Sequence, residues 1–252
     1  MEISGHFDER FSVVRDAFEA NFLADEELGA SAAVTVEGQY VVDLWAGERN
    51  KSGDLWEEDT IVNVYSTTKT MASICMLMLA DRGLIDFEAP VADYWPEFAA
   101  NGKDSVLVRH VMTHQTGCSG FPRPVTVEEL YDHDLMADLL AGMQPWWEPG
   151  TAPGYHAITQ GTLQAELLRR VDGRTLGTFF RDEVTRPLNA DFHIGLPLSE
   201  GHRVAQLDVP KEGIDQIVEG QPDSVALRTF RSCRLDGTET ETDEWRSAEI
   251  PA

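Results

Sequence analysis

The sequence has little of three things: cysteine, basic residues and long apolar runs. Its 252 residues include three cysteines, Cys75, Cys118 and Cys233, too few and too widely spaced for a disulfide framework or a cysteine metal cluster. Twenty basic residues stand against 44 acidic ones, a net charge of −24, which argues against nucleic acid and anionic membranes as partners. No segment reaches the roughly 18 consecutive apolar residues that a membrane helix requires.

Two further classes of feature are missing. The first residues, MEISGHFDERF, contain neither a basic segment nor an apolar one of the kind found in signal peptides, so a cytoplasmic location is expected. No motif for an organic cofactor or a metal is present, and none is expected to bind. His110 and His114 are four residues apart, but no Glu follows His110 and no third ligand stands out, so a packing role is favoured over zinc binding.

The most informative stretch of the chain is residues 61–83. From residue 71 to residue 80 only Ser73 is not plainly apolar, which predicts a helix buried on all sides, and Gly83 supplies a stop. Ser66 and Lys69 precede this run in an S-x-x-K pattern. Because residues i and i+3 share one helix face, the Lys69 amine is expected to reach the Ser66 hydroxyl.

This pairing has a chemical use, although the pattern alone is weak. A serine hydroxyl becomes a good nucleophile when a base takes its proton, and a lysine becomes a base when burial and a helix N-terminus disfavour its charge. The Ser66 N–H, at the same helix start, can stabilise an oxyanion. The alternative is an ordinary N-cap serine followed by a surface lysine, but a lysine directly before a buried run is costly unless its charge is used.

The rest of the chain alternates between helical and extended patterns. Residues 9–23 predict an amphipathic helix, and residues 31–36 and 40–45 predict a hairpin that turns at Gly38. A short strand is expected at residues 60–64, a strand or an extended segment at 191–196, and helices at 105–113, 127–143, 156–171 and 176–184. From residue 198 onward periodicity fades, and residues 208–252 are expected to be a long excursion with little order.

A second chemical candidate is Tyr155, which follows an irregular segment rich in Pro and Gly and begins a predicted helix. A phenol beside a Ser–Lys pair can relay protons as base and acid, although most single tyrosines are core residues. A competing nucleophile is Ser119, within Gly117-Cys118-Ser119-Gly120-Phe121. That segment lacks the closing glycine of a nucleophile elbow, and the sequence favours Ser66.

Taken together, these motifs resemble the serine hydrolases of the penicillin-binding-protein and class C β-lactamase superfamily, and within it the family VIII esterases. The resemblance covers the chain from about residue 9 onward. The matching residues are 66–69 with the apolar helix that follows, 83–86, 108–117, and 149–151 ahead of Tyr155.

The resemblance implies that Ser66 forms an acyl-enzyme and that Lys69 and Tyr155 share the work of base and acid. Many β-lactamases have Asn two residues after the tyrosine, where this chain has Ala157, and that difference suits the esterase branch. The family's third motif, on a C-terminal strand that gives a second oxyanion N–H, has no convincing copy after Tyr155. The chain is therefore expected to stop before the C-terminal strands.

Aromatic residues near these motifs are candidates for an acyl pocket. Tyr65, Trp95, Phe121 and Trp147 are proposed as its walls. Within the cluster of Tyr94, Trp95, Phe121, Trp146 and Trp147, core packing is favoured for at least two of the five.

The fold expected is α/β plus all-α, of the β-lactamase/transpeptidase-like type: an antiparallel sheet flanked by helices, with a helical domain and without the C-terminal strands. Residues 1–87 form the α/β part, 88–190 the helical domain carrying Tyr155, and 191–252 a return segment, with the site between the first two. The expected function is hydrolysis of small carboxylic esters. The alternatives are a β-lactamase or D-Ala-D-Ala peptidase, and an inactive, truncated or binding protein of the same fold.

Overall fold

The computed structural model describes residues 2–24, 27–207, 224–233, 235 and 237–250. It divides into two compact units, one made of residues 1–63 with 199–209 and the other of residues 64–198 with 210–252.

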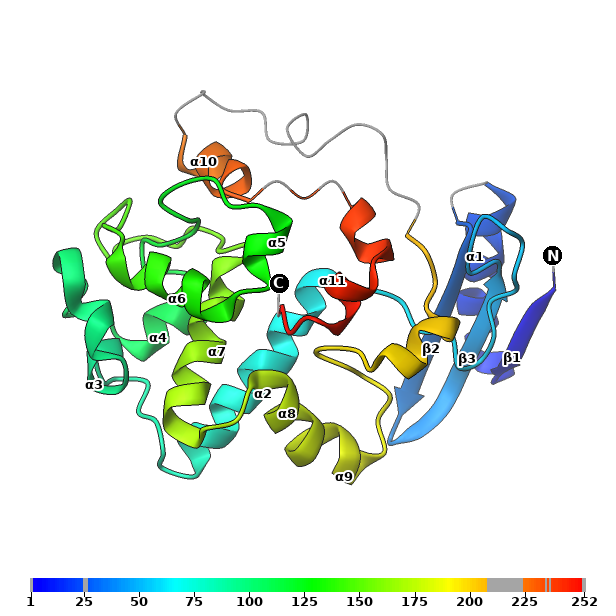
Figure 1. Ribbon diagram of the computed structural model, residues 1–252. Helices are drawn as coiled ribbons and strands as arrows, with labels where there is room; N and C mark the ends of the chain where they lie inside the picture. Colours follow the sequence, from blue (N-terminus) through cyan, green and yellow to red (C-terminus); the bar gives the residue numbers. More distant parts are fainter. Residues whose placement is uncertain (1, 25–26, 208–223, 234, 236, 251–252) are drawn as a thin grey trace. The chain divides into compact units, whose positions relative to one another are not determined.

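The first unit is a three-stranded antiparallel sheet in the order β1-β3-β2, with β1 at Ile3–Phe7, β2 at Gly29–Val36 and β3 at Gln39–Gly47 (Figure 1). Helix α1, Ser12–Leu23, follows a short 3-10 turn at Glu9–Phe11. The side chains of Val42, Leu44 and Ala46 alternate along β3 and pack with Phe18 of α1 in a small core.

The hairpin between β2 and β3 is confirmed, and Gly38 has the positive φ of 77° that the turn requires. Strand β1 was missed. It is short, and it carries Gly5 at its centre, where a Cβ would lie 2.0 Å from the Asp43 carbonyl oxygen of the paired strand. A glycine inside a five-residue strand weakens the period-two pattern by which strands are recognised.

The second unit is helical and is built around the packing of α2 on α7 and α8 (Figure 1). Its helices are α2 (Thr68–Asp81), α3 (Val91–Tyr94), α4 (Val108–Met112), α5 (Val127–Leu130), α6 (His133–Gly142), α7 (Thr159–Asp172), α8 (Leu176–Phe180), α9 (Arg186–Leu188), α10 (Val225–Arg231) and α11 (Asp243–Ser247). Shorter turns of 3-10 type lie at Tyr65–Thr67, Pro96–Gly102 and Thr238–Glu241, and a π-type turn at Arg181–Thr185. A further 3-10 turn, Leu198–Arg203, belongs to the first unit from Ser199 onward.

The prediction that α2 is buried on all sides is wrong. Ala72, Cys75, Met76 and Leu79 are buried in the core, but Leu77 is 54% exposed. Helices α7 and α8 pack against one side of α2, and the apolar composition of the other side does not by itself bring a partner.

Several boundaries also differ from prediction. Residues 60–64 do not form a strand, because Ile61 makes only an isolated parallel bridge with Val204, and residues 191–196 contain no strand either. The helix after Tyr155 begins at Thr159, three residues later than expected. The C-terminal region contains α10 and α11 among its described residues, so it is more regular than predicted, while residues 208–223 lie outside the described part.

Candidate active site

The second unit brings together the three side chains that the sequence singled out as catalytic. The Tyr155 phenol oxygen lies 2.6 Å from Ser66 Oγ, and Lys69 Nζ donates a hydrogen bond of 3.3 Å to the same oxygen. Ser66 is exposed and Tyr155 is 47% exposed, whereas Lys69 is 7% exposed. The hydroxyl is therefore accessible from solvent while its amine partner is buried beneath it.

The start of α2 places Ser66. Ser66 is the middle residue of the 3-10 turn Tyr65–Thr67, which runs directly into α2 at Thr68. Tyr65, the residue before it, has a φ of +42°, a left-handed conformation that a side chain other than glycine adopts at a cost. Such strained residues concentrate where a structure holds a reactive group in a fixed direction.

Burial sets the protonation of Lys69, because it lowers the pKa of the amine to about 8. Its other hydrogen bond, of 2.6 Å, goes to the carbonyl oxygen of Ala157, and its Nζ lies 5.3 Å from the centre of the Tyr155 ring. The methyl side chain of Ala157 cannot accept a hydrogen bond, and the backbone carbonyl of this residue is what the amine contacts. An amine with this pKa is partly neutral near physiological pH and can accept a proton from Ser66.

A second buried lysine provides a comparison. Lys103 is fully buried, and its amine donates to three backbone carbonyl oxygens, those of Ala100, Ala141 and Met143. Those acceptors satisfy the ammonium group completely, which is typical of a structural lysine. Lys69 instead donates one of its hydrogen bonds to the hydroxyl of the exposed Ser66.

The loop that carries Tyr155 is anchored by the histidine that follows it in the chain. His156 is fully buried; its Nε2 lies 2.6 Å from the Thr116 hydroxyl, and its Nδ1 faces the Gly154 carbonyl oxygen. A carbonyl only accepts, so Nδ1 carries the proton and Nε2 accepts from Thr116. Burial lowers the pKa of His156 to about 4, which keeps the ring neutral.

The predicted aromatic pocket is only partly assembled around Ser66. Tyr65 is adjacent to Ser66, and Trp147 lies near Tyr155, with its ring centre 5.9 Å from that of His156. Trp95 and Phe121 are 1% and 2% exposed and belong to the main core, which confirms the prediction that at least two of the five clustered aromatic residues are core. Ser119, the alternative nucleophile, is also buried, 2.6 Å from the hydroxyl of Thr229.

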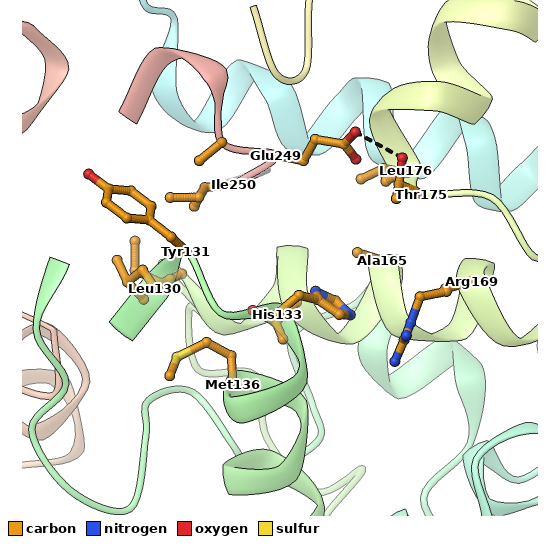
Figure 2. Close-up of a pocket in the computed structure, with 13 residues that line it drawn as sticks. Leu130, Tyr131, His133, Met136, Ala165, Arg169, Thr175, Leu176, Glu249 and Ile250 are labelled. Atoms are coloured by element: carbon orange, nitrogen blue, oxygen red, sulfur yellow. Dashed lines mark hydrogen bonds between the residues drawn. The ribbon is translucent and has the colours of Figure 1, made fainter. Parts of the chain in front are cut away.

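A separate cavity of about 250 Å³ is lined by α5, α6, α7, α8 and the segment after α11 (Figure 2). Its lining is mainly apolar, and several of its polar side chains have partners. Glu249 accepts from the Thr175 hydroxyl, while His133 and Arg169 bind the buried carboxylate of Glu166. None of the three predicted catalytic residues lines it.

Among the described residues no group of three or more His, Cys, Asp or Glu side chains is placed to hold a metal ion. His110 Nδ1 accepts the N–H of Leu107, and His114 Nδ1 accepts that of His156, so each ring has a separate structural contact. Every helix in the described ranges is too short or too polar to span a membrane.

The model of the Beta-lactamase protein family matches residues 15–226. The chain belongs to this family. The resemblance to penicillin-binding proteins, class C β-lactamases and family VIII esterases is thereby confirmed, together with the β-lactamase/transpeptidase-like fold.

Several members of the Beta-lactamase family are similar to this chain over most of its length. The "Esterase/beta-lactamase LipL" of Mycobacterium tuberculosis (strain ATCC 25618 / H37Rv) is 42% identical over 213 residues, covering 83% of this chain and 49% of that protein. The "Esterase EstB" of Burkholderia gladioli is 27% identical over 241 residues, covering 88% of this chain and 57% of its own. The chain therefore spans about half the length of the curated relatives that it matches.

Solved structures agree. The crystal structure of a family VIII carboxylesterase has a TM-score of 0.89 and 42% identity, covering all of this chain and 67% of that one. A penicillin-binding protein homologue from Caulobacter crescentus has a TM-score of 0.86 and 39% identity, with the same coverage.

Proposed function

We propose that this protein is a serine hydrolase that cleaves small carboxylic esters through an acyl-enzyme on Ser66. One observation carries the proposal: Ser66 Oγ is exposed and lies within hydrogen-bond distance of both a buried amine and a phenol. Relatives named esterase support the same conclusion.

The geometry supports a reaction in two stages, acylation of Ser66 and then deacylation. In acylation, Ser66 Oγ attacks the ester carbonyl as its proton passes to the neutral amine of Lys69. The carbonyl oxygen becomes an oxyanion, for which the backbone N–H of Ser66, at the start of the helix, is one donor. The C–O bond to the alcohol then breaks, and the proton held between Lys69 and Tyr155 goes to the departing alkoxide.

Deacylation repeats these steps with water as the nucleophile. Tyr155 and Lys69 take a proton from water, hydroxide adds to the acyl carbonyl, and the proton returns to Ser66 Oγ as the carboxylic acid leaves. Acylation and deacylation both need a group that accepts a proton and then donates it near neutral pH. The lowered pKa of Lys69 fits that requirement.

The test is hydrolysis of p-nitrophenyl acetate and p-nitrophenyl butyrate by the wild type, Ser66→Ala and Ser119→Ala. The Ser66 variant is expected to lose roughly 10⁴-fold or more in kcat, because no other hydroxyl replaces the nucleophile. Ser119→Ala is the matched control and should keep its activity, because Ser119 is buried against Thr229 away from the pair. Equal activity of the wild type and Ser66→Ala would contradict the proposal, and a folded but inactive wild type would favour a binding protein.

β-Lactam hydrolysis is a second candidate, because the similar LipL protein is named both esterase and beta-lactamase. The two reactions share the acyl-enzyme and differ in what the site does to the opened lactam. Ala157 offers Lys69 only a backbone carbonyl and no side-chain amide. We therefore expect nitrocefin to be turned over more slowly than p-nitrophenyl acetate, and the reverse order would favour the lactamase.

A further inference from the structure

Tyr155 is placed by loops and not by a helix. It precedes the first residue of α7 by four positions, its ring is half-exposed, and the chain before it is irregular. A phenol that exchanges protons with Ser66 must stay within about 3 Å of it, so something must hold this part of the loop. The contacts around Tyr155 identify His114.

His114 binds the residues on both sides of Tyr155. Its backbone carbonyl oxygen accepts the Gly154 N–H at 2.9 Å, and its Nδ1 accepts the His156 N–H at 3.0 Å. Its ring also packs on the Tyr155 ring, with the two centres 4.9 Å apart and the planes tilted by 47°. A Cβ at Gly154 would lie 2.6 Å from the Trp147 ring, so the backbone of the loop also packs closely against that ring.

The backbone of His114 is also unusual. It follows α4 and has a φ of +60°, a left-handed conformation that only a few per cent of residues other than glycine adopt, with Asn, Asp and His the most frequent among them. In this conformation the carbonyl oxygen and the ring of His114 reach two N–H groups of the same loop, those of Gly154 and His156. Left-handed residues of this kind are found where the surrounding structure holds them for a purpose.

The ring of His114 has to be neutral to accept a hydrogen bond at Nδ1. Burial and the nearby charge of Lys69 both lower the pKa of His114, in that order of importance, and favour the neutral ring. Neither ring nitrogen contacts Ser66. His114 therefore has no direct part in the proton transfers.

We propose that His114 is the positioning residue for Tyr155, acting mainly through the hydrogen bond that its Nδ1 accepts from the His156 N–H. The inference rests on the proposed function, in which Tyr155 moves protons to and from Ser66. It assigns a role to a residue whose imidazole contacts neither the nucleophile nor its base.

Three variants separate the contributions of His114. His114→Asn keeps an acceptor at nearly the position of Nδ1 and tolerates the left-handed backbone, but it has no ring. His114→Phe keeps a ring and has no acceptor. His114→Gly has neither, and it removes the backbone strain, so it should fold even where the phenylalanine variant does not.

The measurements are kcat and KM for p-nitrophenyl acetate, with thermal unfolding to confirm that each variant is folded. His114→Phe and His114→Gly are expected to lose about 10- to 100-fold in kcat with little change in KM, and His114→Asn to stay within about fivefold of the wild type. A purely structural role would lower the melting temperature and leave kcat per folded molecule unchanged. That result would overturn the proposal, as would an asparagine variant no better than the glycine one.

Two further readouts isolate the link to Tyr155. In a Tyr155→Phe background, His114→Gly should cause little additional loss of kcat, because the group that it positions is already gone; additive losses would overturn the proposal. The chain has five tyrosines, so 3-fluorotyrosine labelling, with Tyr155 assigned by Tyr155→Phe, follows that residue by ¹⁹F NMR without any substrate. Its resonance should shift in His114→Gly and return toward the wild type in His114→Asn, and an unmoved resonance would refute the inference even if the protein hydrolysed no ester.

Discussion

The phenol oxygen of Tyr155 lies 2.6 Å from the hydroxyl oxygen of Ser66, although 89 residues separate the two along the chain. Lys69 contacts both residues, donating to Ser66 Oγ and lying 5.3 Å from the centre of the Tyr155 ring. The residues proposed as nucleophile, base and proton relay thus meet in one place.

Removing the phenol oxygen should slow the chemistry without unfolding the protein. Tyr155→Phe deletes the atom nearest Ser66 Oγ but keeps the ring that packs on His114. We expect kcat to fall by roughly 10²–10⁴, the usual contribution of a positioned acid or base, with the melting temperature nearly unchanged because the residue is half-exposed. An unchanged kcat would remove Tyr155 from the mechanism.

The rate should depend on pH through Lys69. The neutral amine is the base, and burial lowers its pKa to about 8, so kcat/KM should rise tenfold per pH unit below about pH 8 and level off above it. Lys69→Arg should be nearly inactive at every pH, because a guanidinium does not lose its proton. A flat profile between pH 6 and pH 9 would show that Lys69 is not the base in free enzyme.

Stability should depend on pH through His156. The folded state holds this ring neutral, with a pKa of about 4 against an ordinary 6.5, so the unfolded chain binds the extra proton first. The stability due to the neutral ring is complete above about pH 6.5 and is lost as the pH falls toward 4. By linkage the loss is about 3 kcal/mol in the free energy of unfolding.

Denaturant unfolding at pH 7 and pH 4.5 measures this loss. His156→Asn should be less stable than the wild type at pH 7 but should lose less stability on acidification. The exposed histidine of β1 provides a control, and His6→Asn should behave as the wild type does. An equal acid sensitivity of the wild type and the His156 variant would contradict the role given to the buried ring.

The helical core in which α2 packs on α7 should be sensitive to cavities. Leu167→Ala removes a fully buried side chain of α7 and should lower the free energy of unfolding by about 2–5 kcal/mol. Leu77→Ala removes the same atoms from the exposed side of α2 and should cost less than about 1 kcal/mol. Similar losses for the two variants would mean that α2 is covered on both sides in solution.

Much of this arrangement could be predicted from local sequence. The S-x-x-K spacing placed Lys69 beside Ser66 because helix geometry relates residues three apart, and the period-two pattern with Gly38 predicted the hairpin. The contact between Tyr155 and Ser66 was expected from the family resemblance, because no local sequence pattern contains it. The distance between Tyr155 and Ser66 depends on how two loops pack, which a single sequence does not reveal.

The features that the sequence did not predict also depend on how separate segments pack together. Strand β1 carries Gly5, which the close approach of the Asp43 carbonyl oxygen on β3 explains, and α2 exposes Leu77 because composition cannot say which sides of a helix find partners. His114 was recognised as a packing residue, but its two contacts beside Tyr155 follow from a left-handed backbone. Trp95 was proposed for the pocket and lies in the core, since an aromatic side chain serves either place equally well.

The central claim, that Ser66 is an activated nucleophile, is tested most directly by labelling with a fluorophosphonate probe. Intact mass and peptide mapping would be compared for the wild type and Ser66→Ala. The account predicts a single adduct on Ser66 in the wild type and none in the variant. A folded wild type that takes no label, or a variant that is labelled equally well, would contradict it.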